Sequence, residues 1–320
     1  MGGPARRGAP GPRLDGLPGR HPPWTSRREA RSLMTTQTLH VTRPSRSVLR
    51  TLTAVSNETV KGLRHGWSER WQILIEVPLV VTFLLILGYT VGKGQTMVSA
   101  GKLDWTLDPR QAAWLFVGMA SYMYAYLHLQ KMFWRLLVEI QSGTLEQTYL
   151  SPLPSWVHVV GGRVVAAVAE TAVVVAVMFG VTSLIVDLDL HWRLEALAPL
   201  ALLIVGAAGF ALIVAGITLV WKRIQMLNDL VLMGVMFFSG AVLPRDAMPA
   251  WAEAAGAPIF LTHSVEGLRT VMLDGAAIPV SGQGGLIWTL GTAAAWFAAG
   301  LVVFRACERI ALRQGSLSHF

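Results

Sequence analysis

The residue types in this sequence supply no recognisable nucleotide-binding or hydrolytic motif. The nearest approach to a phosphate-binding loop is Gly88-Tyr89-Thr90-Val91-Gly92-Lys93-Gly94, whose spacing differs from G-x-x-x-x-G-K-[ST]. Neither H-E-x-x-H nor G-x-S-x-G occurs. His263 and Glu266 share one helical face at i,i+3, but a third metal ligand is not apparent. We therefore expect a chain that has no catalytic residue, no metal and no cofactor of its own, and that is not an enzyme.

Two acidic residues stand inside apolar stretches, Glu76 and Glu170. A charge near the centre of a membrane costs at least ~2.5 kcal/mol, so we expect both on the cytosolic side. There, water or Arg163, Lys222 or Arg223 would offset them. For Glu76 we favour a solvated interfacial position, whereas for Glu170 a solvated and a partnered position both stay open. Two acids without a wider polar stripe make a poor proton relay.

The composition shows why an acidic residue inside an apolar stretch of this chain is significant. Hydrophobic residues make up 53% of the 320 residues and charged ones only 14%, and the mean hydropathy is +0.48. These values predict a polytopic membrane protein. The formal net charge of +8 is concentrated before the first apolar stretch, which suits anionic lipid better than nucleic acid. A single cysteine, Cys307, excludes an intrachain disulfide.

An all-α fold with six membrane-spanning helices follows from the apolar windows. Such a helix needs about 20 apolar residues. The fifth window is the weakest, because Gln225, Asn228 and Asp229 occupy its first turns. The six predicted spans cover residues 72–91, 111–128, 164–186, 196–220, 224–242 and 285–304.

Three domains are predicted along the chain. Residues 1–46 form a disordered basic tail, of which 1–33 is not translated if synthesis begins at Met34. Residues 47–310 form the transmembrane domain, which opens with an amphipathic helix over 47–66 lying on the membrane surface. A poorly ordered basic tail is the alternative for that segment. Residues 311–320 form a cytosolic C-terminal tail.

The distribution of the 27 Lys and Arg residues gives the orientation, because most fall on the side of the N-terminus. Both termini are therefore expected in the cytosol, together with the connection between the second and third spans. In that connection Gly143 and the Pro152/Pro154 pair flank a predicted short helix over Thr144–Leu150, with Glu146 in its first turn. A rigid helix here suggests a surface to which a partner binds. The alternative is a solvated interfacial helix without a partner.

The connection over residues 244–284 is too apolar for an ordinary extracellular loop. Residues 250–260 are about half as long as a span, and residues 262–273 have the pattern of an amphipathic helix. We expect a re-entrant helical hairpin that packs on the fifth and sixth spans, since backbone that turns within the membrane must be covered by protein.

Three motifs in a fixed order carry a resemblance. They are Gly143-Thr144-Leu145-Glu146 followed by Ser151-Pro152-Leu153-Pro154; Phe238-Ser239-Gly240-Ala241-Val242-Leu243-Pro244 with Met248-Pro249-Ala250-Trp251; and Leu261-Thr262-His263-Ser264-Val265-Glu266-Gly267-Leu268-Arg269. With the order of spans, they resemble the six-span type-2 ABC exporter permeases, which include daunorubicin-type drug, nodulation lipo-oligosaccharide and polysaccharide exporters. The likeness covers about residues 45–310. Members often carry proline where this chain has Phe260.

The resemblance implies a permease subunit in a bacterial-type inner membrane that exports a hydrophobic or amphiphilic substrate, drug-like, lipid or lipo-oligosaccharide. It implies two copies of a separate ATP-binding subunit, which would bind ATP and Mg, and a second permease, identical or different. The residues implied in coupling to the ATPase are Glu139, Gly143, Thr144, Leu145, Glu146, Ser151, Pro152 and Pro154. Those implied in an outer gate are Gly240, Pro244, Pro249, Trp251, Thr262, Glu266 and Arg269.

Two other classes stay open. A gradient-driven secondary transporter or a channel would work without an ATPase and would show ionisable groups along a pore. A structural or assembly protein would use the hairpin as a docking surface. Substrate identity cannot be predicted from these residues.

Overall fold

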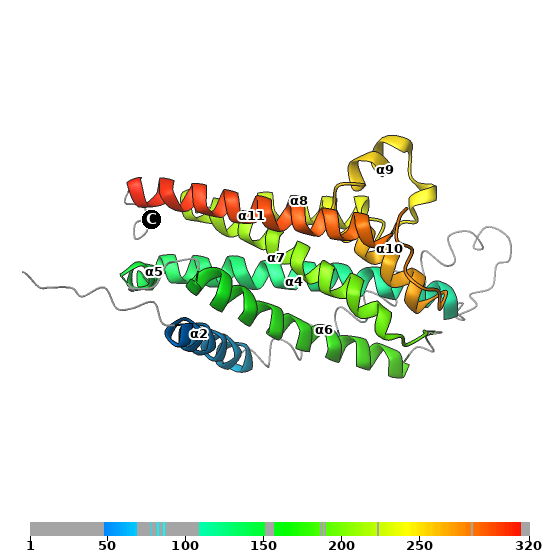
Figure 1. Cartoon of the computed structure of the whole chain (residues 1–320), viewed down its shortest axis with the longest axis horizontal. Coiled ribbons are helices and arrows are strands. Elements are labelled where there is room, and N and C mark those ends of the chain that lie inside the picture. The colour runs from blue at the N-terminus through cyan, green and yellow to red at the C-terminus, as the bar shows by residue number, and fades with distance from the viewer. Residues whose placement is uncertain are drawn as a thin grey trace, which may run out of the picture. The chain divides into compact units, whose positions relative to one another are not determined.

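Helices make up almost all of the chain that the computed structural model describes (Figure 1). The described residues are 48–68, 78, 82, 86, 109–150, 157–185, 188, 190–222, 224–282 and 284–314. No strand occurs in these ranges, all of which belong to one unit, Arg46–Phe320. The predicted all-α fold is therefore confirmed. The tail over 1–46, nearly all of the first predicted span with Glu76, and the Ser151–Pro154 motif lie outside the described residues.

Within the described residues, three helical segments are long and apolar enough to cross a membrane. They cover His158–Leu184, Leu194–Val220 and Leu286–Gln314 and correspond to the third, fourth and sixth predicted spans. The first consists of a π-helical turn, η1 (Val157–Val164), and α6 (Val165–Ile185). The second contains η2 (Leu194–Ala196) and α7 (Leu197–Val220), and the third is α11 (Leu286–Gln314). α11 extends ten residues beyond the predicted end of the sixth span.

Helix α4 (Pro109–Gln141) is longer than the sequence predicted. The helix continues past residue 128, where the second predicted span ends, because the helical spacing of apolar residues continues: Leu129, Met132, Phe133, Leu136 and Ile140 are all buried. At 1.5 Å per residue, 33 residues extend about 50 Å.

Helix α8 (Gln225–Phe238) is shorter than the predicted fifth span. It begins after a break at Trp221–Lys222 that ends α7, and it is an apolar helix of 14 residues. A transmembrane helix in a bilayer of ordinary thickness needs about 17–25 residues. Six spans therefore stay a prediction.

The core is built around α7, which packs along α11 on one side and against α4 on another. The α7–α11 contact is close because small residues face each other: a Cβ on Gly300 would lie 2.2 Å from the carbonyl oxygen of Gly209. Small residues permit such close approach of membrane helices. These glycines thus serve a contact within the chain.

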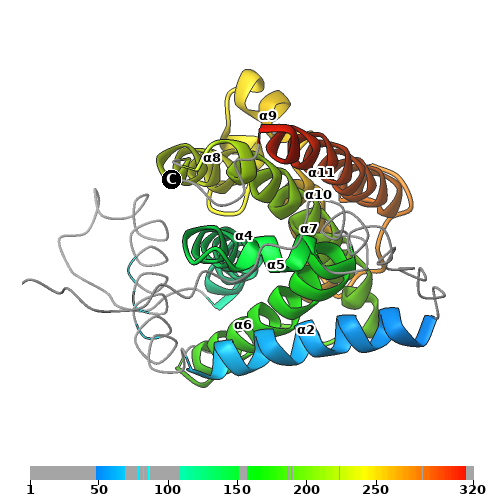
Figure 2. The ribbon, with the colours of Figure 1, turned by 90° about the vertical axis from the view of Figure 1, so that its left-hand side faces the viewer.

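The remaining helices gather at the two ends of the bundle (Figure 1). Helix α5 (Thr144–Tyr149) lies at the end where α11 finishes, and α2 (Val48–Ser68) lies near the same end. Figure 1 views α2 almost end-on and Figure 2 views it lengthwise, so it lies crosswise to α4 and α7. Helices α9 (Ala250–Gly256) and α10 (Phe260–Met272) lie at the opposite end.

Candidate functional site

Helix α5 is fixed to the bundle on one side and exposed on the other. The turn before it contains Gly143 at φ 69°, a left-handed conformation that glycine adopts without strain. Leu145 is fully buried, whereas Thr144 and Glu146 are exposed. Tyr149 closes the helix; burial, and then the neighbouring Glu308 carboxylate of α11, raise the pKa of its hydroxyl. A short helix anchored in this way presents a rigid polar surface.

An ion pair lies close to α5. Glu139, in the last turn of α4, accepts a hydrogen bond from Arg163 in η1. The Arg163 side chain is 7% exposed and that of Glu139 20%, so the pair is largely shielded from water. Charge-assisted hydrogen bonds of this kind are stronger than neutral ones. The contact joins the two helix ends between which α5 lies.

A second ionic cluster surrounds Glu170 of α6. Nη2 of Arg135 lies 2.5 Å from both carboxylate oxygens, and Nζ of Lys131 lies 3.5 Å from one of them. All three side chains are at most 15% exposed. Both observed cations come from α4, one turn apart. Of the cations expected to offset Glu170, Arg163 pairs with Glu139 instead, and Arg223 lies outside the described residues.

Helix α2 packs directly on this cluster. Nη2 of Arg135 also approaches the carbonyl oxygen of Gly62 at 3.4 Å. Further along α2, Glu58 lies 4.0 Å from Nδ1 of His158 in η1. The cluster therefore connects α2, α4 and α6 at one end of the bundle.

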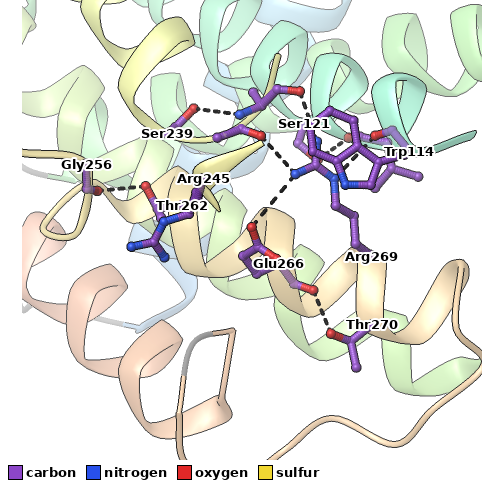
Figure 3. Close-up of polar contacts among 12 residues, drawn as sticks. Trp114, Ser121, Ser239, Arg245, Gly256, Thr262, Glu266, Arg269 and Thr270 are labelled. Carbon is purple, nitrogen blue, oxygen red and sulfur yellow. Dashed lines mark hydrogen bonds and ion pairs between the residues drawn. The ribbon is translucent and has the colours of Figure 1, made fainter. Parts of the chain in front are cut away.

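At the opposite end, Arg269 fixes α10 to the rest of the molecule (Figure 3). Its Nη1 donates to the carbonyl of Gly240 at 2.8 Å, its Nη2 to that of Ala241 at 3.0 Å and its Nε to that of Trp114 at 3.3 Å. The guanidinium carbon lies 3.5 Å from the centre of the Trp114 ring. A buried cation is tolerated where carbonyls and an aromatic face replace water. Glu266, one turn earlier, lies 3.9 Å from Nη1.

This arrangement requires a small residue on α4. A Cβ at Gly118 would lie 2.1 Å from the carbonyl oxygen of Ala241 and 2.4 Å from Nη2 of Arg269. Both distances are far below van der Waals contact. Gly118 therefore permits the Arg269 contact, although nothing in the sequence around it marked this role.

Further contacts hold the two short helices together. Thr262 Oγ1 donates to the carbonyl of Gly256 at 2.7 Å, which ties the start of α10 to the end of α9. Indole Nε1 of Trp296 in α11 donates to the carbonyl of Pro258 at 2.7 Å. Trp251 is 67% exposed and packs edge-on against Phe238. Of the predicted hairpin prolines, Pro244 precedes the short helix η3 (Arg245–Ala247) and Pro249 precedes α9.

Those predicted site residues that the structure describes fall into two groups at opposite ends of the bundle. The sequence analysis did not identify the partners of Glu170 and Arg269. These partners are Lys131 and Arg135 for Glu170, and Trp114 for Arg269. The sequence does carry a signal for Lys131 and Arg135, because two cations at i and i+4 on one helix lie on the same face and can contact the same neighbour. No such signal exists for Arg269, because it contacts main-chain atoms.

These features define an all-helical body in which three of the described helices are long and apolar enough to cross a membrane. The chain belongs to the ABC-2 type transporter family, whose model matches residues 59–273. This match confirms the resemblance found in the sequence. Members of this family are permease components of ABC transporters, so an ATP-binding partner subunit is implied. A comparison with curated proteins found no match.

Proposed function

We propose that this chain is the permease subunit of an ATP-driven exporter, and that α5 is the surface through which a separate ATP-binding subunit drives it. The proposal rests on the way that α5 packs against the bundle. Leu145 is fully buried while Thr144 and Glu146 are exposed, so a partner contacting the exposed face moves a helix that cannot slide independently.

The ion pairs near α5 support this role. Glu139–Arg163 and Arg135–Glu170 link α4, η1, α6 and α2, so a displacement of α5 reaches several helices. An ATPase that binds the inward-facing and outward-facing states with different affinity shifts the balance between them. The hairpin formed by α9 and α10, at the far end, is then the outer gate.

The assembly proposed around this chain contains two ATP-binding subunits, which carry ATP and Mg, and a second permease subunit. Both termini and α5 lie in the cytosol, and the membrane is a bacterial-type inner membrane. The cargo is hydrophobic or amphiphilic, because the surfaces of α6, α8 and α11 are largely apolar.

The test is ATP-dependent transport in vesicles that contain this chain and its ATP-binding partner. Glu146→Arg reverses a charge on the exposed face of α5 and is expected to abolish ATP-driven flux while the permease still inserts. Glu195→Arg makes the same change at an exposed position in the turn before α7, and full flux is expected there. Normal export by a stably inserted Glu146→Arg variant would contradict the proposed role of α5.

A gradient-driven transporter is the second candidate. It would show uphill flux in vesicles that contain only this chain, without ATP or a partner. The same preparation therefore decides between the two.

A further inference from the structure

Helix α11 continues beyond the length that a membrane requires. Its 29 residues extend about 44 Å at 1.5 Å per residue, whereas a hydrocarbon core of about 30 Å needs about 20 residues. Counted from Leu286, the twentieth residue is Arg305. Residues 306–314 therefore extend about 14 Å past the boundary of the hydrocarbon. They do so at the end of the bundle where α5 lies (Figure 1).

Three arginines stand one turn apart on this part of α11, and all of them are exposed: Arg305, Arg309 and Arg313. Because residues four apart advance by about 40° around a helix, the three lie within an arc of about 80°. The middle one, Arg309, lies about 140° around the helix from buried Phe304 and about 160° from buried Ala311. The arginines therefore form one basic stripe on the face opposite the bundle.

The basic stripe is not neutralised by acidic side chains in the part of the chain that the structure describes. None of its three arginines forms an ion pair there. The single acid among residues 305–314 is Glu308, whose carboxylate accepts a hydrogen bond from Tyr149 of α5. Helix α7, which packs along α11, contains no charged residue. Three exposed positive charges are thus directed to the surroundings of the chain.

The same face of α11 is apolar where the helix is expected to cross the membrane. Gly291, Ala298 and Val302 are exposed and lie within about 20° of Arg309 around the helix. An acyl chain that lies along this face brings its headgroup to the level of the arginines. The Cα–Cβ bonds of a helix tilt toward its N-terminus, which here is the membrane side. Arg309 and Arg313 therefore lean back toward the headgroups, and their long side chains extend further in that direction.

We propose that the basic stripe and the apolar face beside it form a binding site for an anionic phospholipid. The acyl chains lie along the face that contains Val302. The phosphate accepts hydrogen bonds from Arg305 and Arg309, and Arg313 adds its charge. A guanidinium group suits this role because its planar fork donates to two phosphate oxygens at once. On the proposed orientation the lipid lies in the cytosolic leaflet; the site does not otherwise depend on the exporter proposal.

Charge and position decide between the occupants of this surface. The positive-inside rule requires cations near the cytosolic end of a span, but on no particular face of the helix. A second copy of the chain on the same face would bring two basic stripes together, which like-charge repulsion opposes. A soluble acidic partner fits the arginines but not the apolar face that continues into the membrane. An anionic phospholipid complements both parts.

The experiment measures which lipid lies beside α11 in the full chain. Val302→Cys in a Cys307→Ser background leaves one cysteine, on the apolar face, for a bimane label. The chain is placed in phosphatidylcholine nanodiscs that contain a small fraction of nitroxide-labelled lipid, either phosphatidylglycerol or phosphatidylcholine. Both carry the nitroxide at the same place on the acyl chain. The ratio of their quenching of bimane therefore gives the preference for the headgroup.

The intact basic stripe should favour phosphatidylglycerol about tenfold or more, since each basic residue near an anionic lipid surface strengthens the attraction about fivefold. Glutamine at all three positions (Arg305→Gln, Arg309→Gln and Arg313→Gln) should abolish the preference. Lysine at the same three positions should retain most of it, which excludes a folding defect as the cause of the loss. A label at Val173→Cys, on an exposed position of α6, should show no preference, because α6 contains no Lys or Arg.

Three results would overturn the proposal. The first is equal quenching by the two lipids, or a preference that survives the three glutamines. The second is an equal preference at position 173, since the attraction would then belong to the whole surface and not to the basic stripe. The third is a disulfide that joins two copies through position 302, because the face would then be a subunit interface.

The lipid site and the exporter proposal can fail separately, because these measurements use neither ATP nor a partner subunit. If phosphatidylglycerol is not preferred while ATP and the partner drive flux, the lipid site fails and the exporter proposal stands. If phosphatidylglycerol is preferred but ATP and the partner drive no flux, the exporter proposal fails and the lipid site stands.

Discussion

Replacing Arg269 with methionine should loosen α10 from the bundle. The guanidinium contacts three main-chain carbonyls and one indole ring, and together these join α10 to the start of α4 and to the turn after α8. Methionine has a similar length and no donor. Arg269→Met therefore removes the hydrogen bonds without creating a large cavity.

The size of the destabilisation follows from the groups that lose their partner when Arg269 is replaced. A buried acceptor without a partner costs about 1–3 kcal/mol, and three carbonyls lose their donor here. A desolvated cation–π contact contributes about 2 kcal/mol more. Part of this loss in docking free energy is offset. Burying the charge of Arg269 costs several kcal/mol, and the variant does not carry that charge. We expect the free energy of docking α10 to fall by about 3–5 kcal/mol, similar to the loss of one partner in a buried ion pair.

Hydrogen exchange of the amides in residues 260–272, measured on the full chain in nanodiscs, reports this local opening. Each 1.4 kcal/mol is about tenfold, so exchange should accelerate about 10²–10⁴-fold. Arg110→Met is the matched control: Arg110 lies 2.8 Å from Asp274, but the two side chains are 69% and 51% exposed. Exposed pairs contribute about 0–1 kcal/mol, so the control should change exchange by less than about tenfold. Equal exchange rates in the two variants would refute the assignment of Arg269 as the main anchor.

Two further predictions concern the thermal stability of the purified chain. Gly118→Ala places a Cβ 2.1 Å from a main-chain carbonyl and should cost about 1–3 kcal/mol. Gly180→Ala, in a helix with nothing within 4 Å, should gain up to about 1 kcal/mol; a loss in both would contradict the steric explanation. Glu170→Gln leaves two buried cations without a counter-charge and should cost about 3–5 kcal/mol. Asp274→Asn, in an exposed pair, should cost less than about 1 kcal/mol, and an equal loss in the two variants would argue against burial as the cause.

Local signals predicted the positions of most helices. Glycine and proline mark where chains turn, and Gly143 and Pro249 indeed stand beside the short helices α5 and α9. Long apolar runs predicted α6, α7 and α11, because hydropathy over about 20 residues is sufficient for a membrane helix. These features depend on neighbours in sequence, so the sequence alone carries them.

The errors came from features that depend on distant neighbours. The second predicted span ends at residue 128, yet α4 continues to Gln141, and Lys131 on this continuation contacts a carboxylate on α6. The acceptors of Arg269 lie 155, 29 and 28 residues away and are backbone atoms. The i,i+4 spacing of Lys131 and Arg135 indicates that both face one neighbour but does not identify it as Glu170, and no sequence spacing indicates the contacts of Arg269.

Because Arg269 binds backbone oxygens, its three hydrogen bonds depend on carbonyls and not on the side chains of the accepting residues. A carbonyl is present whatever residue stands at 241, and at 114 only the aromatic contact would be lost. The donor has no substitute, since lysine offers a single charged nitrogen in place of a planar fork. Substitution of an accepting residue therefore leaves its carbonyl in place, whereas substitution of Arg269 removes all three donors at once.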